Sequence, residues 1–167
     1  EIIYEDDHLL VVNKPHNITV HDAPSVKDAN LVDWLKLKKI SLSTISGEER
    51  HGIVHRLDKG TSGVMVVAKS NEAHLGLSRQ LEDKSMGRYY LAIMDMPLKE
   101  NIIVEKPIGR NVNNRLKMSI EENGRNAKSA FSKIALSDNE KFELIAAKLY
   151  TGRTHQIRVH LSSMNRH

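Results

Sequence analysis

The chain has 167 residues, 40% of them hydrophobic, which is enough for one core and one domain. It has no cysteine, which excludes disulfides and thiolate metal sites and fits a reducing cytoplasm. It has no apolar run of about 18 residues and no charged-then-apolar leader, so we expect neither a membrane span nor a signal peptide. We predict a cytoplasmic monomer.

The positive charge is unevenly distributed. The net charge is +4 and the pI about 9.3. Two stretches hold basic residues and no acid: 106–119, with Lys106, Arg110, Arg115 and Lys117, and 148–160, with Lys148, Arg153 and Arg158. Either stretch alone could be a solvated strand face, but together they indicate a surface that contacts phosphates.

The first third of the chain predicts a strand and a short helix. Residues 9–12 are a short apolar run closed by Pro15, which is typical of a buried strand that ends in a turn. Asn30 is a candidate N-cap, with Asp33 completing an imperfect capping box, so we predict a helix over 31–39. This helix is expected to bury Leu31, Trp34 and Leu35.

The middle third predicts a loop, a turn, a strand and a helix. Polar residues 41–50 favour a loop, 57–63 a turn, and 64–68 a central strand. Ser70 or Asn71 caps a helix that we expect to end at Gly87, and its apolar face is Ala73, Leu77 and Leu81.

Beyond residue 87, strands follow one another. The predicted ranges are 88–94, 102–107, 115–120, 127–136, 141–150 and 154–161. Strands outnumber helices, which argues for an α+β domain with a mixed, largely antiparallel central sheet and flanking helices.

A polar cluster lies between two apolar segments at 51–63. An acid at this turn, Asp58, would sit at the rim of the sheet, where a site can form. An ordinary turn in which Asp58 accepts backbone N–H bonds is the alternative interpretation.

Residues 151–161 form a second polar cluster. Read as a strand, this segment turns Gln156, Arg158 and His160 to one face, and His155, Ile157, Val159 and Leu161 to the other. The first face could be exposed to solvent, or it could pair with a carboxylate and grip RNA. Arg158 and Asp58 are then the natural ion pair.

Other chemistries fit less well. Metal binding is disfavoured because His51 and His55 lie four residues apart, about 13 Å in extended chain. A zinc–nitrogen bond is only about 2 Å long, so the two rings would not reach one ion. Ser62 lies outside any Gly-x-Ser-x-Gly elbow, and no phosphate loop or dinucleotide fingerprint occurs. Aromatic residues are 4% of the chain, so base stacking would rest on Tyr89 or Tyr90, one of which must face inward.

Four segments resemble the motifs of the RluA/RluD family of RNA pseudouridine synthases, in matching order and spacing. The clearest is His55-Arg56-Leu57-Asp58-x-x-Thr61-Ser62-Gly63. The others are 5–15, Arg88-x-Tyr90-x-Ala92 and 152–160. Residues 52–59 and the pair Val20-His21 look closest to the branch that modifies large-subunit ribosomal RNA.

The resemblance implies that a uridine in RNA is isomerised to pseudouridine without a cofactor or metal. It gives catalytic roles to Asp58, Tyr90 and Arg158: Asp58 as essential carboxylate, Arg158 as its partner, and Tyr90 packed on the uracil. It places Ile157 as an apolar floor and Arg56 against the backbone or in the gap left by the flipped base. The remaining implied substrate contacts are His55, Leu57, Thr61, Arg153, His155 and Gln156.

The resemblance also implies missing parts. Family members continue after the last motif with a Gly-Asp-x-x-Tyr segment and further strands, and many in this branch carry an S4-type domain before the first motif. We therefore expect residues 1–167 to be a fragment, a catalytic domain truncated at its C-terminus. Ribosomal RNA is the leading substrate; transfer RNA, or an inactive RNA-binding relative, are the alternatives.

Overall fold

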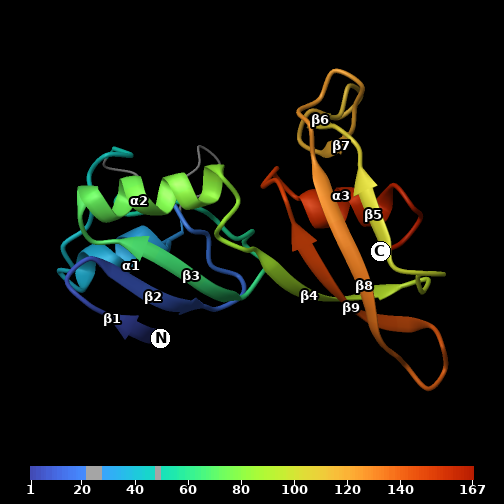
Figure 1. The fold of residues 1–167 in the computed structure, drawn as a ribbon, viewed down its shortest axis with the longest axis horizontal. Coiled ribbons are helices and arrows are strands. Elements are labelled where there is room, and N and C mark those ends of the chain that lie inside the picture. The colour runs from blue at the N-terminus through green and yellow to red at the C-terminus, as the bar shows by residue number, and fades with distance from the viewer. Residues whose placement is uncertain (22–27, 48–49) are drawn as a thin grey trace. The chain divides into compact units, whose positions relative to one another are not determined.

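The computed structural model describes residues 1–21, 28–47 and 50–167. They form two compact units, an N-terminal unit, Glu1–Met86, and a C-terminal unit, Gly87–His167 (Figure 1). The described residues contain three helices and nine strands, and their strand pairs are antiparallel, which confirms the α+β class. That both units make one catalytic domain stays a prediction.

The N-terminal unit is built on a three-stranded sheet. Its strands, in sheet order, are β1 (Ile2–Glu5), β2 (Leu9–Lys14) and β3 (Gly63–Ala68). Alternate β2 side chains, Leu10, Val12 and Lys14, are buried. The β2–β3 register pairs Lys14 with Gly63, so the end of β2 lies beside the turn that enters β3.

The two helices of this unit follow their capping signals. Helix α1 (Leu31–Leu37) begins after Asn30, which makes a complete capping box with Asp33. The helix buries Val32 beside Leu31 and Leu35, whereas Trp34 is only half-buried, so that part of the prediction was wrong.

Helix α2 (Asn71–Glu82) is capped by the Ser70 side chain, which accepts the N–H of Ala73. It ends before Gly87, contrary to prediction, because Asp83 is its C-cap and Lys84 has a positive φ. Residues 41–47, the described start of the loop predicted over 41–50, contain neither helix nor strand, as expected; residues 48 and 49 of that loop lie outside the described residues.

The C-terminal unit has a four-stranded sheet, a hairpin and one helix. The sheet order is β4 (Tyr89–Asp95), β9 (Phe142–Leu149), β8 (Lys128–Leu136) and β5 (Ile102–Glu105). The hairpin pairs β6 (Ile108–Arg110) with β7 (Met118–Ile120). Sequence analysis missed β1 and β6, and it began β7 too early.

The predicted strand at 154–161 is wrong, because the segment forms helix α3 (Gln156–Ser162). His155 precedes it in the left-handed region, at φ 55°. The helix buries Gln156, Val159, His160 and Leu161, at helical spacing. Arg158 is exposed, so it does not share a face with Gln156 and His160 as predicted.

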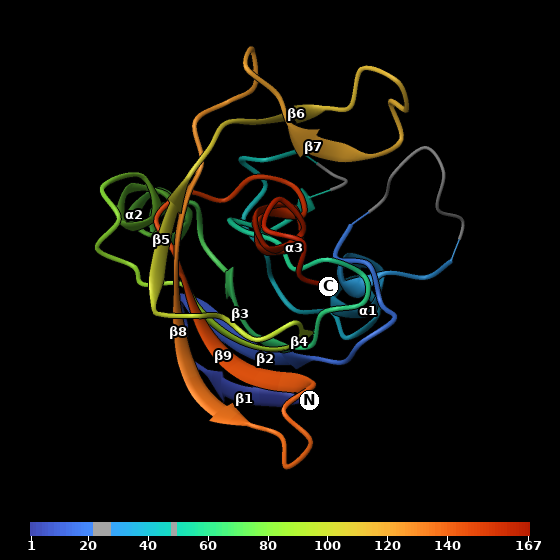
Figure 2. The same ribbon diagram turned by 90° about the vertical axis from the view of Figure 1, so that its right-hand side faces the viewer.

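Helix α3 packs between the sheet and the hairpin. On one side, Ile157 and Leu161 contact the sheet core formed by Met94, Leu98, Val104, Phe131, Ile145 and Ala147. On the other side, Val159 packs with Ile108 and Ala127. Figure 2 views α3 nearly end-on, with β8 and β9 curving beside it.

Candidate functional site

The polar turn at 55–63 is fixed against the edge of β3. The His55 ring accepts the N–H of Val66 through Nε2 at 3.1 Å. Ile53 forms a one-residue bridge with Val67. The stretch before Asp58 is therefore attached along β3, rather than being a free loop.

Asp58 lies half-buried where this segment turns into β3. Its carbonyl accepts the N–H of Thr61 at 3.0 Å, which closes the turn. Leu57 is buried and Arg56 is exposed. The turn thus combines an apolar anchor, a half-buried carboxylate and an exposed guanidinium within three consecutive residues.

A buried lysine, Lys14, holds the same turn from the other side. Its ammonium donates to the carbonyls of Pro15 and Ile18, at 2.9 and 2.8 Å, and reaches that of Lys59 at 3.5 Å. Burial lowers the pKa of Lys14, and the nearby negative charge of Asp58 opposes that shift. Sequence analysis treated Lys14 only as the end of a strand. The alternation of Leu10, Val12 and Lys14 could have placed it on the buried face.

Tyr90 and Ile157 come together in the C-terminal unit. Both are partly buried and pack against the same sheet core. Tyr89 faces the other way and is 69% exposed, with the Lys148 ammonium 5.4 Å from its ring centre. This confirms that one tyrosine of the pair faces inward, and identifies it as Tyr90.

The Gln156 side chain, only 2% exposed, fixes the loop that precedes α3. Its Oε1 accepts the Thr151 hydroxyl at 2.8 Å and the Arg153 N–H at 3.0 Å. Its Nε2 donates to the Lys128 carbonyl at 3.0 Å and to the Ser129 hydroxyl oxygen at 2.8 Å. The amide thus uses all four of its hydrogen-bonding positions inside the unit.

His160 continues this network in its neutral form. The Lys106 carbonyl can only accept, so Nε2 of His160 carries the proton and donates to it, at 3.1 Å. Nδ1 then accepts the Ser129 hydroxyl at 3.0 Å. Burial lowers the pKa of His160, which favours the same neutral ring.

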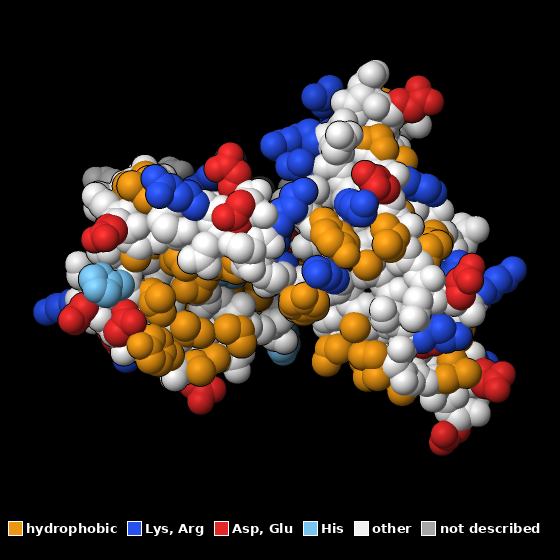
Figure 3. Space-filling view, viewed as in Figure 1, with side chains coloured by type: hydrophobic (Ala, Val, Ile, Leu, Met, Phe, Trp, Pro, Cys, Tyr) orange, Lys and Arg blue, Asp and Glu red, His pale blue; other side chains and the backbone are white. Residues whose placement is uncertain are grey.

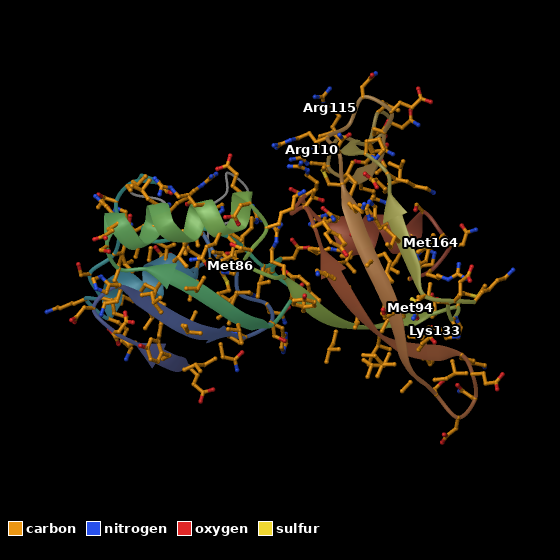
Figure 4. The ribbon with its side chains drawn as sticks, in the orientation of Figure 1. Met86, Met94, Arg110, Arg115, Lys133 and Met164 are labelled. Atoms are coloured by element: carbon orange, nitrogen blue, oxygen red, sulfur yellow. The ribbon has the colours of Figure 1, made fainter. Side chains whose placement is uncertain are left out.

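Basic side chains gather around the β6–β7 hairpin (Figure 3). Arg110 and Arg115 are exposed and project from it (Figure 4). The Arg110 guanidinium donates to the Arg115 carbonyl at 3.2 Å, which braces the hairpin loop. The stretch 106–119, which was predicted to contact phosphates, forms this hairpin. Its two arginines are exposed to solvent.

The predicted catalytic residues are divided between the units. Asp58 belongs to the N-terminal unit, and Tyr90 and Arg158 belong to the C-terminal unit. The ion pair between Asp58 and Arg158 therefore stays a prediction.

Two kinds of feature are absent from the described ranges. No three His, Cys, Asp or Glu side chains are grouped there as ligands for one metal ion. In the same ranges, no helix has the length and apolarity needed to cross a membrane.

Comparison with known proteins gives one consistent family. A family model described as RNA pseudouridylate synthase matches residues 8–163. The chain is 54% identical over 173 residues to an uncharacterized RNA pseudouridine synthase of Helicobacter pylori strain J99, covering 100% of this chain and 53% of that protein. It is 45% identical over 165 residues to the ribosomal large subunit pseudouridine synthase D of Zymomonas mobilis, covering 98% of this chain and 52% of that protein.

Solved structures agree with these sequence matches. The human protein RNA Pseudouridylate Synthase Domain Containing 1 superposes with a TM-score of 0.78 at 26% identity, covering 99% of this chain and 65% of that chain. The chain spans about half the length of the curated relatives it matches.

Proposed function

The chain belongs to the RNA pseudouridylate synthase family, and we propose that the intact protein isomerises uridines in structured RNA to pseudouridine. The observation that carries this proposal is the half-buried Asp58 carboxylate, on a turn fixed by His55 on one side and by Lys14 on the other. A positive charge near a carboxylate favours its charged form, which is the form that a nucleophile or base needs.

The reaction exchanges one bond for another within the nucleotide. The N1–C1′ bond breaks, a C5–C1′ bond forms, and the C5 proton is lost while N1 gains one. Asp58 acts as nucleophile at the sugar or the base, or as base at C2′. The exchange is redox-neutral, so we propose no cofactor or metal. The target base must leave its stack to reach the carboxylate.

Residues of the C-terminal unit complete the proposed site. Tyr90 packs on the uracil and assists loss of the C5 proton, Ile157 supports the ring, and Arg158 pairs with Asp58. Further RNA contacts are His55, Arg56, Thr61, Arg153 and His155. For Leu57 and Gln156, which are buried, we propose positioning roles instead of direct contact.

We propose large-subunit ribosomal RNA as the substrate. The name of the Zymomonas mobilis relative, ribosomal large subunit pseudouridine synthase D, supports this choice. Pseudouridine mapping of total RNA from cells with and without the gene tests it. Loss of a ribosomal position is the expected result, and loss of a transfer RNA position would redirect the proposal. A monomer in the cytoplasm stays a prediction.

The activity itself is tested with RNA carrying tritium at C5 of uridine. The intact protein should release tritium in proportion to the pseudouridine formed. Binding of the RNA without release would identify an inactive RNA-binding relative instead.

A further inference from the structure

Three arginines from separate segments lie near the loop at Gly152 in the C-terminal unit. Arg153 follows it in the chain, Arg125 lies just before β8, and Arg88 lies just before β4. Arg88 is held beside this loop because its carbonyl accepts the N–H of Leu149 at 2.9 Å. A Cβ atom added at Gly152 would collide with Nη1 of Arg88, so the guanidinium lies directly against the bare backbone.

Among the residues that the structure describes, no acid forms a salt bridge with these guanidinium groups. The salt bridges among the described residues involve lysines alone. Nε of Arg88 is buried without a hydrogen-bond partner, and Nε of Arg153 donates to the neutral Asn126 carbonyl at 2.9 Å. Burial, and then the positive charges of Arg125 and Arg88, lower the pKa of Arg153. The charges of Arg125 and Arg88 therefore each lie close enough to repel that of Arg153.

The backbone that carries these arginines is fixed. Gln156 holds the Arg153 N–H, and the backbone of Arg125 exchanges two hydrogen bonds of 2.9 Å with Ile108. The backbone at these arginines is thus fixed before any ligand arrives, and an anion would relieve the repulsion between their charges. A guanidinium presents donors in a planar fork that matches the oxygens of a phosphate group.

We propose that Arg88, Arg125 and Arg153 form a binding site for a phosphate group of the RNA backbone, with Gly152 as its opening. The proposal rests on the proposed function for its ligand, since it takes RNA as the substrate. It adds Arg88 and Arg125 to the residues that the sequence assigns to RNA.

The test compares RNA binding by variants of the intact protein over a range of salt concentrations. Arg125→Ala should weaken binding and reduce the log–log salt slope by about 0.7–0.9, the value for one lost phosphate contact. Lys141→Ala is the matched control, because it removes an exposed positive charge from the same unit, at the turn between β8 and β9. It should leave the affinity and the slope unchanged.

Gly152→Ala tests the geometry of the site without changing any charge. Its methyl group must displace the end of the Arg88 side chain, which is flexible, so the fold should persist. We expect weaker RNA binding at an unchanged melting temperature. If Arg125→Ala and Gly152→Ala both bind RNA like Lys141→Ala, there is no phosphate site here.

A second arm titrates the protein with inorganic phosphate at constant ionic strength. For a backbone site, inorganic phosphate should bind far more weakly than RNA, and the variants should lose RNA affinity. Tight phosphate binding that the variants lose, with RNA binding intact, would assign the site to a free phosphate and overturn the proposal. Wild-type protein that fails to bind RNA would overturn this proposal together with the proposed function. If the wild type releases tritium normally and the variants bind RNA as the wild type does, the phosphate-site proposal alone is overturned.

Discussion

In the N-terminal unit a charged side chain, Lys14, holds the turn that carries Asp58. In the C-terminal unit neutral side chains, chiefly Gln156 and His160, hold the loop that carries Arg153. The Lys14 ammonium is buried with the negative charge of Asp58 nearby, whereas the buried side chains of Gln156, Ser129 and His160 carry no formal charge.

This difference follows the task proposed for each unit. A reacting carboxylate benefits from a fixed positive charge nearby, which keeps it ionised and oriented. A surface that binds phosphates needs its positive charges at the exterior, and a neutral interior can fix their backbone without cancelling them. Separate substitutions can therefore damage chemistry in one unit and the RNA-binding loop in the other.

Of the substitutions that test this comparison, Lys14→Met should cause the largest loss of activity. The substitution leaves three carbonyls without their donor and removes the cation beside Asp58. Because a displacement of about 1 Å at a reacting group can cost on the order of 10²-fold, we expect at least that loss of rate.

The control for this variant is Lys36→Met, in the exposed last turn of α1. It should retain the wild-type rate. A Lys14→Met enzyme within a few-fold of wild type would show that the ammonium does not support Asp58.

Gln156→Leu should destabilise the C-terminal unit. It leaves the Thr151 hydroxyl and the Arg153 N–H without their acceptor, and it removes one of the two hydrogen bonds to the Lys128 carbonyl. We expect a loss of roughly 2–4 kcal/mol in the free energy of unfolding, measured by denaturant titration. Ser162→Ala, at an exposed position of α3, is the control. Equal stability of the two variants would contradict a structural role for the amide.

Acid should weaken both units through one buried histidine each. Burial lowers the pKa of His74 in the N-terminal unit and of His160 in the C-terminal unit. The unfolded chain, with a histidine pKa of about 6.5, then binds more protons than the folded chain, so stability should fall as the pH drops below about 6.5.

Amide hydrogen exchange at pH 7.5 and pH 5.5 measures this effect in each unit separately. His74→Leu should reduce the acid sensitivity of the N-terminal unit alone. His160→Asn should reduce that of the C-terminal unit alone. If both variants lose as much exchange protection on acidification as the wild type does, these two histidine rings are not the cause.

Local signals predicted much of the fold. The apolar runs at 9–12 and 64–68 and the cap at Asn30 depend on neighbouring residues, so the sequence contains the whole signal. Helix α3 was mistaken for a strand because its short segment fits both periods. Ile157, Val159 and Leu161 alternate as in a strand, but Ile157 and Leu161 also share one face of a helix.

The candidate site was predictable where its residues are adjacent in the chain. The motif around Asp58 could be identified from a short segment, and so could the expectation that either Tyr89 or Tyr90 faces inward. The contact of Lys14 with Lys59 and that of Arg88 with Gly152 join residues 45 and 64 positions apart, and only the folded chain brings them together. The same holds for His160, whose partners Ser129 and Lys106 lie on distant segments.

The central claim is that Asp58 carries the chemistry, and Asp58→Asn in the intact protein tests it most directly. The substitution keeps the size of the side chain and removes its charge. Tritium release from C5-labelled RNA should fall by on the order of 10⁴-fold or more, while RNA affinity stays within a few-fold of wild type, because the phosphate contacts lie elsewhere. Appreciable turnover by Asp58→Asn would contradict the assignment.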